Sequence, residues 1–282
     1  MPATRPPIDT VREAADLWLA RQNRNDELRL KTLQWCRRWH AEVVARLGGR
    51  RVDAVTVDVL EDAARVETWS RSTRRGFIDV ALACLKLANW EPDRKLKKPR
   101  KASAGAKKVI TEAQHLQILG RSQGDFREYV RVLWELGCRP GELAQVTVEL
   151  VNWRESIAVL TDHKTAHATG RPRTLYFTDR AIQVLNEQKK KYGSGLLFRD
   201  ANGKAFGDQV VVKRFLRIAG SLGFAVTAYS YRHTFITRAL LAGIPSAQVA
   251  EMTGTSIAMI ARNYGHLEAR PGLMREVVNK LG

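Results

Sequence analysis

The stretch Ala228–His266, which reads AYSYRHTFITRALLAGIPSAQVAEMTGTSIAMIARNYGH, decides how the second half of the chain folds. Capping and breaking residues divide it into three short helices. The caps and breakers expected along it, in order, are Ser230, Gly243, Pro245, Gly254 and either Thr255 or Ser256.

Two residues of this stretch carry chemical interest. Arg232 is predicted in the first turn of a helix, where backbone N–H groups and the helix dipole already favour an anion. Tyr264 is predicted near the end of the third helix, where its side chain can project from the surface. An arginine and a later tyrosine are weak evidence alone, so their order relative to other motifs decides.

Upstream segments add two further positions. A helix over residues 126–136 is expected to end at Gly137, and Pro140 then starts a new one, which places Arg139 at a corner between helices. Strand-like alternation over residues 157–161 and 174–177 predicts a hairpin, and Lys164 lies in the segment between the two strands.

The ordered motifs resemble those of the tyrosine recombinases, also called phage-type integrases. The matching segments are Arg139-Pro140-Gly141-Glu142-Leu143, Lys164-Thr165, Arg232-His233-Thr234-Phe235, Thr253-Gly254-Thr255-Ser256-Ile257 and Tyr264-Gly265-His266. The resemblance covers residues 109–266 closely, and residues 9–91 only through the number and placement of their helices.

The resemblance implies how these residues share a reaction. Arg139 and Arg232 would neutralise the charge that develops on a phosphodiester, with a bidentate geometry that lysine cannot copy. Tyr264 would be the nucleophile that forms a 3′-phosphotyrosyl intermediate, and Lys164 would protonate the leaving 5′-oxygen. The bond energy stays in the phosphotyrosine, so no metal ion, ATP or other cofactor is expected.

The chain departs from the family pattern at two positions. Tyr229 stands where the family has a histidine three residues before the second arginine, and Thr255 stands where it has histidine or tryptophan. Both are candidate substitutes that hydrogen-bond a phosphate oxygen, although Thr255 is equally suited to be a helix cap. His233 is expected to pack and hydrogen-bond rather than to catalyse. A DNA-binding relative that has lost cleavage therefore remains an alternative.

The composition supports a polyanionic partner. The 282 residues include 47 Lys and Arg against 29 Asp and Glu, a formal charge of +18, which favours double-stranded DNA over a merely basic soluble protein.

The three cysteines are far apart, which suggests a reducing compartment. The expected location is the cytoplasm, in association with the nucleoid. The most apolar run, residues 77–90, is interrupted by Asp79 and Lys86, so no membrane span is expected. His163 and His167 lack a third ligand, so no metal site is expected.

The first part of the chain reads as helical. Helical periodicity runs over residues 9–48, 57–69 and 72–90, and a flexible basic segment follows. Candidate DNA contacts, each of which could equally belong to a solvated face, are Arg71, Arg74, Arg75, Lys97, Lys98, Arg100 and Lys101.

The predicted fold is mainly α with a small β-sheet or hairpin. Residues 1–92 would form a helical core-binding domain that clamps DNA, residues 93–108 a basic linker, and residues 109–282 a mixed α+β catalytic domain with a C-terminal tail. The resemblance implies a homotetramer on two DNA sites that exchanges tails 267–282 between protomers. The target sequence, the direction of recombination and any accessory protein cannot be read from the sequence.

Overall fold

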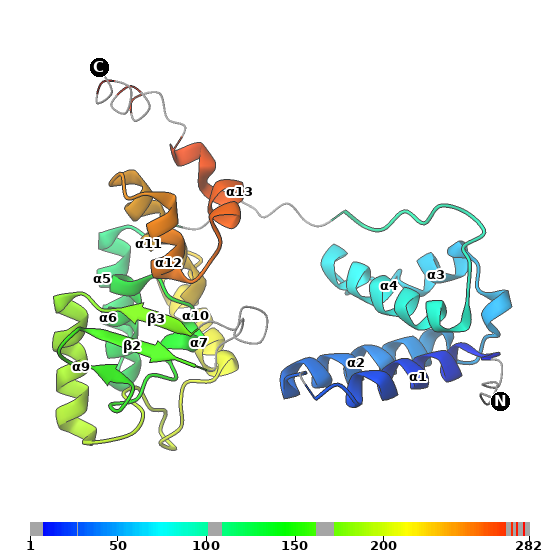
Figure 1. Cartoon of the computed structure of the whole chain (residues 1–282), viewed down its shortest axis with the longest axis horizontal. Coiled ribbons are helices and arrows are strands. Elements are labelled where there is room, and N and C mark those ends of the chain that lie inside the picture. The colour runs from blue at the N-terminus through cyan, green and yellow to red at the C-terminus, as the bar shows by residue number, and fades with distance from the viewer. Residues whose placement is uncertain are drawn as a thin grey trace. The chain divides into compact units, whose positions relative to one another are not determined.

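The structure, a computed structural model, describes residues 8–26, 28–100, 109–161 and 172–268, together with residues 272, 275 and 279. The chain forms two compact units, Met1–Gly105 and Ala106–Gly282 (Figure 1). Each unit has its own apolar core, and the second contains a further small cluster built by its last three helices.

The described elements of unit 1 are all α-helices and 3-10 turns. Its elements are α1 (Val11–Asn23), α2 (Leu30–Leu47), the 3-10 turn η1 (Val52–Ala54), α3 (Val57–Ala63), α4 (Arg71–Leu85) and the 3-10 turn η2 (Lys86–Ala88). Helix α1 packs against both α2 and α4. An aromatic group holds the core, since the ring of Trp39 meets Trp69 edge-on with centroids 5.7 Å apart and lies 6.4 Å from Phe77.

The helical pattern predicted over residues 9–48 forms two helices, and one helix predicted in this unit is too long. The pattern over residues 9–48 is interrupted between Asn23 and Leu30, where most residues are polar. The helix predicted over residues 57–69 ends at Ala63. Trp69 lies beyond that helix, and it reaches the core from a connecting segment with the guanidinium of Arg46 over its ring at 4.6 Å.

Unit 2 combines helices with one antiparallel sheet. Its described elements are α5 (Glu112–Arg121), α6 (Gly124–Leu136), α7 (Pro140–Leu143), β1 (Val151–Asn152), β2 (Ile157–Leu160), β3 (Arg173–Tyr176), α9 (Asp179–Tyr192), α10 (Asp208–Leu222), α11 (Ala228–Leu241), α12 (Ser246–Thr253) and α13 (Ile257–Glu268). The sheet order is β1-β2-β3, and Leu160 pairs with Arg173 at the end of the hairpin. Helix α6 packs against α9 and α11.

The predicted fold class is confirmed, because helices dominate and the sheet is small. The hairpin strands, α9 and α10 fall where the sequence predicted them, and β1 was missed. Gly137 ends α6 with φ +61°, and a Cβ there would lie 2.3 Å from the Phe235 ring. Glycine at this corner therefore lets α11 approach the end of α6 closely.

The last three helices differ by a few residues from their predicted starts. Thr227 caps α11, and Ser230 is its partner in a capping box rather than the cap itself. Arg232 therefore lies in the second turn of α11 and not in the first. Pro245 is the residue before α12, and the Ser256 hydroxyl accepts a hydrogen bond from Met259 N–H at 3.2 Å, which makes Ser256 the cap of α13.

Candidate active site

Arg232 is held inside unit 2. Its side chain is 7% exposed, and its Nη1 donates to the carbonyl oxygens of Gly137, at 3.2 Å, and of Thr253. Burial lowers the pKa of Arg232, the nearby charge of Arg139 lowers it further, and the carboxylate of Glu142 opposes both effects. A guanidinium remains protonated in spite of such shifts, so this is a fixed positive charge.

Arg139 reaches the same place from another helix. It precedes Pro140 at the start of α7, and its backbone N–H and its Nη1 both donate to Glu142, at 3.0 and 2.6 Å. Its Nη2 donates to the carbonyl oxygen of Gly254 at 2.5 Å. Glu142 is a structural partner in this geometry, since its carboxylate is 5% exposed and pairs with Arg139.

The C-terminus of α12 is the common partner of these guanidiniums. Carbonyls in the last turn of a helix lack helical partners and carry the negative end of its dipole. Arg232 takes the Thr253 carbonyl and Arg139 takes the Gly254 carbonyl, so the two predicted catalytic arginines occupy consecutive acceptors. Two positive charges are thus gathered immediately before Thr255.

A third arginine at this helix end was missed from the sequence. Arg173 is 5% exposed and donates to the carbonyls of Glu251 and Met252 at 2.7 and 2.6 Å. One signal was available, because strand alternation places Arg173 on the same buried face as Leu175. A charged residue on the buried face of a strand needs polar partners, and here the end of α12 provides them.

The sequence predicts that the side chain of Tyr264 can project from its helix, but in the structure it does not project from α13. It is 4% exposed and belongs to the apolar cluster that α11, α12 and α13 share. Its hydroxyl hydrogen-bonds Nδ1 of His233, the residue after Arg232 in α11. Burial raises the pKa of Tyr264 to about 12, and the charge of Arg232 acts in the opposite direction. The phenol is therefore protonated and enclosed in this state.

The two substitute positions differ in exposure. Tyr229 lies in the first turn of α11 and is 51% exposed, whereas Thr255 is half-buried and its N–H donates to the Ala250 carbonyl at 3.0 Å. Thr255 is close in sequence to the acceptors of both arginines. Lys164 and the pair His163 and His167 lie outside the described residues.

The DNA-contact candidates of unit 1 differ in their exposure and in whether their side chains already have partners. Arg71, Lys97 and Arg100 are exposed. Arg74 and Arg75 are half-buried and donate to the carbonyls of Val66, at 3.0 Å, and Pro99, at 3.1 Å. The ammonium of Lys98 lies 2.6 Å from Asp79. Lys101 lies outside the described residues.

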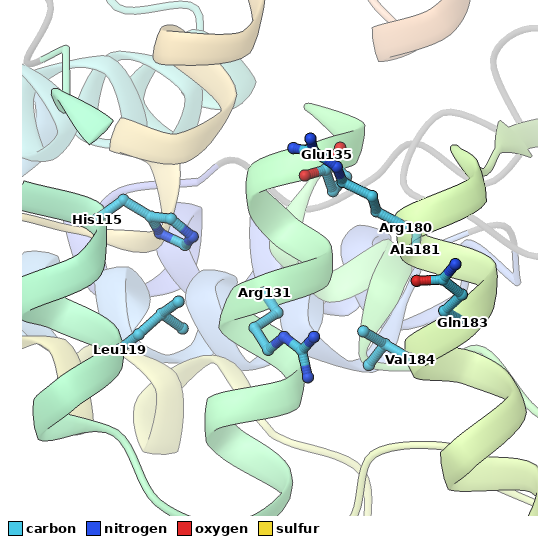
Figure 2. A pocket seen from close by; sticks show the side chains of 8 residues that line it. All are labelled: His115, Leu119, Arg131, Glu135, Arg180, Ala181, Gln183 and Val184. Atoms are coloured by element: carbon cyan, nitrogen blue, oxygen red, sulfur yellow. The ribbon is translucent and has the colours of Figure 1, made fainter. Parts of the chain in front are cut away.

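A pocket of about 310 Å³ lies elsewhere in unit 2, among α5, α6 and α9 (Figure 2). The residues that line it are His115, Leu119, Arg131, Glu135, Arg180, Ala181, Gln183 and Val184. None of the predicted catalytic residues is among them. Within the described ranges, no group of three or more His, Cys, Asp or Glu side chains is arranged to hold a metal ion. No helix in the described part of the chain has the length and apolar composition of a membrane span.

A known protein family matches more than half of this chain. A family model described as the phage integrase family matches residues 108–270. No curated protein sequence matches the chain.

Solved structures match over nearly the whole chain. A structure of the Tn1549 transposon integrase in complex with a circular intermediate DNA has a TM-score of 0.75 at 17% identity, covering 98% of this chain and 100% of that chain. A lambda integrase dimer bound to a core site has a TM-score of 0.74 at 13% identity, covering 93% and 78%. A lambda integrase tetramer bound to a Holliday junction has a TM-score of 0.71 at 13% identity, covering 91% and 83%. At these identities the likeness shows that the fold is shared.

Proposed function

The chain belongs to the phage integrase family, and from that premise we propose that it is a site-specific DNA recombinase that cleaves and rejoins DNA through a 3′-phosphotyrosyl intermediate. In this reaction Tyr264 attacks the scissile phosphorus, and the 5′-oxygen leaves as a hydroxyl after it receives a proton from Lys164. Arg139 and Arg232 neutralise the non-bridging oxygens in the transition state. Reversal of these steps with a new 5′-hydroxyl joins the exchanged strand.

One observation supports this assignment most strongly. Arg139 and Arg232 come from segments far apart in the sequence, and yet they donate to consecutive carbonyls, Gly254 and Thr253. A guanidinium has five N–H donors, so the carbonyls can hold both side chains in place while donors that they do not use bind a phosphate. Tyr264 hydrogen-bonds the residue next to Arg232, and the charge of Arg232 acts on its pKa, which supports one site for the nucleophile and the charges.

The enclosed position of Tyr264 is not the one from which it attacks. Attack on phosphorus requires that its hydroxyl leave His233 and that α13 move toward the bound phosphate. Arginines close to a phenol favour the phenolate and lower its pKa, so the raised pKa of Tyr264 in the enclosed state falls once the side chain reaches them. Tyr229, which is exposed on the same helix as Arg232, and Thr255 contribute hydrogen bonds to the phosphate oxygens.

The proposed reaction needs no divalent ion and no nucleotide. Two guanidiniums supply the charge that a metal ion would otherwise supply, and the phosphotyrosine conserves the bond energy for rejoining. Cleavage should therefore proceed at an unchanged rate in EDTA. A rate that depends on added Mg²⁺ would contradict this part of the proposal.

We further propose the division of labour between the parts of the chain. Residues 1–92 clamp the duplex, residues 93–108 lie along its backbone, and residues 109–282 carry the reaction. The proposed assembly is a tetramer on two DNA sites, in which residues 267–282 of one protomer dock on the next, and the lambda integrase tetramer bound to a Holliday junction supports the tetramer. Deletion of residues 269–282 should impair assembly on DNA and spare binding of a single protomer, as native gels with one-site and two-site DNA would reveal.

The test of the proposed function is covalent trapping. The protein is incubated with nicked suicide duplexes from the DNA that flanks its gene, and a denaturing gel separates protein–DNA adducts. An adduct is expected for the wild type and none for Tyr264→Phe, which removes only the hydroxyl. Tyr176→Phe is the matched control, because Tyr176 is exposed at 45% on β3 and should trap normally.

Absence of an adduct from a wild-type protein that binds the same DNA tightly would contradict the proposed function. It would favour a DNA-binding relative that has lost cleavage, and Tyr229→His with Thr255→His would then be the variants to examine. An adduct that persists in Tyr264→Phe would instead show that another nucleophile acts.

A further inference from the structure

Arg173, the first residue of β3, has no role in the reaction as proposed above, and yet both of its Nη atoms make hydrogen bonds inside unit 2. Nη1 donates to the carbonyls of Thr174 and Glu251, at 2.6 and 2.7 Å, and Nη2 donates to Met252 at 2.6 Å. Nε faces Oε2 of Glu142 at 3.5 Å. The side chain is 5% exposed and both of its Nη atoms donate to backbone carbonyls, so Arg173 is enclosed within unit 2 rather than presented to DNA.

The contacts of Arg173 reach the segments that hold both catalytic arginines. Glu142, which Arg173 faces, is also the carboxylate that accepts two hydrogen bonds from Arg139. Arg173 donates to the carbonyls of residues 251 and 252 at the end of α12. The next two carbonyls along the chain accept from Arg232 and Arg139. One buried guanidinium therefore connects the supports of the other two.

Arg173 also fixes the hairpin that carries Lys164. It pairs with Leu160 in the ladder between β2 and β3, and the segment that joins these strands contains Lys164. Its own guanidinium binds the next carbonyl of the strand, that of Thr174. The end of the hairpin is thereby attached to the C-terminus of α12.

The backbone beside Arg173 is matched to its presence. Gly254 has φ +66°, and a Cβ at this position would lie 2.4 Å from Nε of Arg173 and 3.0 Å from its Cδ. Side chains larger than hydrogen are excluded both by the conformation and by the guanidinium. A buried charge is costly unless hydrogen bonds compensate it. The planar guanidinium of arginine holds several donors in fixed directions, so it can reach acceptors on different segments at once.

From these contacts we propose that Arg173 is a positioning residue for strand cleavage: through Glu142 and the end of α12 it sets the orientation of the Arg139 and Arg232 guanidiniums toward the scissile phosphate. The role rests on the proposed function. Arg173 itself does not touch the DNA. Its contribution is to hold two charges in place before the phosphate arrives, so that they need no rearrangement as the transition state forms.

Arg173→Lys tests the proposal, because it keeps the charge and removes the fork. The rate of covalent adduct formation on a suicide duplex should fall about a hundredfold, which is the cost of a misplacement of about 1 Å. The dissociation constant for the same DNA should change by less than about threefold, since many other phosphate contacts hold the duplex. Arg154→Lys, in the exposed turn before β2 of the same sheet, is the matched control and should cleave at the wild-type rate.

A neutral substrate separates positioning from a general loss of structure. A methylphosphonate at the scissile position replaces one charged oxygen by a methyl group, so less charge needs to be neutralised. The defect of Arg173→Lys should then shrink to about tenfold or less, whereas a general loss of structure would cost the same on both substrates. If Arg173→Lys does not fold, Glu142→Gln serves instead, because it leaves the carbonyl contacts of Arg173 and weakens the link to Arg139.

Three outcomes would overturn the inference. Wild-type cleavage by Arg173→Lys would remove the positioning role, and so would a loss of rate that matches an equal loss of DNA binding. An equal defect on charged and neutral phosphates would assign Arg173 to the fold alone. Failure of the wild type itself to form an adduct is distinguishable from these, and it would overturn the proposed function together with the role of Arg173.

Discussion

The two units differ in how deeply they bury their most enclosed cations. In unit 1 the cations that make ion pairs lie at the surface beside carboxylates, as where Arg94 contacts Asp58 at 2.5 Å and Lys98 contacts Asp79 at 2.6 Å. In unit 2 Arg173 and Arg232 are buried and donate to backbone carbonyls. Exposed pairs contribute little to stability and exchange partners easily, whereas a buried guanidinium bound to a helix end has one geometry.

This difference corresponds to two tasks on a polyanion. Surface cations can release a carboxylate and take a phosphate at small cost, which suits binding that is independent of sequence. Fixed guanidiniums suit catalysis, because charge that is already oriented need not reorganise in the transition state. Substitutions of the buried guanidiniums should therefore slow cleavage, whereas substitutions of the surface cations should weaken DNA binding.

The largest effect is expected from Arg232→Lys. Lysine keeps the charge but cannot donate in the same bidentate geometry, so adduct formation should slow about 10²–10³-fold with DNA binding nearly unchanged. Arg238→Lys, exposed on the same helix with its guanidinium 4.7 Å from the Trp134 ring, is the matched control. Equal rates for the two variants in single-turnover cleavage would remove the distinction between buried and exposed arginines.

Unit 2 also buries a histidine, His115, in its neutral form. His115 stacks on Trp134 with ring centroids 4.3 Å apart, and its Nδ1 lies 3.2 Å from the Tyr231 hydroxyl. Burial, and then the charge of Arg238, lower the pKa of His115 to about 4. An unfolded histidine takes up a proton near pH 6.5 and the folded one does not, so its contribution to stability is present above pH 6.5 and is lost as pH falls toward 4.

Between pH 7 and pH 5 this linkage should remove about 2 kcal/mol from the free energy of unfolding. His115→Gln should flatten the pH dependence over that interval, even if it lowers stability at pH 7. Urea unfolding at the two pH values measures both quantities. A slope for His115→Gln as steep as that of the wild type would mean that other groups cause the acid sensitivity.

Sequence patterns predicted the elements better than the site. The 3.6-residue and two-residue periods located α9, α10 and the hairpin, because those elements bury one continuous face. Thr227 was missed as the cap of α11 because Ser230 lies within the same turn, and cap preference alone does not choose between a hydroxyl at the cap and one at its partner position. That choice shifted Arg232 by one helical turn.

The partners of the site residues lay beyond sequence reasoning. Motif order identified Arg139, Arg232 and Tyr264 as candidates, but nothing local says that one helix end, at residues 251–254, receives three guanidiniums. The contact between His233 and Tyr264 depends on how α13 packs against α11. Such contacts are tertiary, so periodicity and capping carry no information about them. The catalytic roles themselves stay predictions until trapping is done.

A smaller effect is expected from the exposed cations of unit 1, and two neighbours sharpen the comparison. Arg71 is exposed, whereas Arg74 donates to the Val66 carbonyl at 3.0 Å. If about eight phosphates are contacted, log affinity should fall with log salt at a slope near −7, and Arg71→Gln should reduce that slope by about one. Arg74→Gln should chiefly lower the melting temperature. Fluorescence anisotropy at several salt concentrations separates the two, and an unchanged slope in Arg71→Gln would remove Arg71 from the DNA interface.

The smallest effect is expected where a carboxylate competes with DNA for its cations. Asp79 lies 2.6 Å from the Lys98 ammonium and 3.8 Å from the Arg75 guanidinium, and both cations are predicted DNA contacts. Asp79→Asn should tighten DNA binding by about twofold to fivefold, since it removes a charge that phosphate repels, and it should change the free energy of unfolding by less than about 0.5 kcal/mol. Asp53→Asn removes a similar exposed partner, 2.8 Å from Arg51, away from the predicted contacts and should leave affinity unchanged. Equal affinities for the two variants would mean that Lys98 and Arg75 do not face DNA, and the surface cations of unit 1 would then need another explanation.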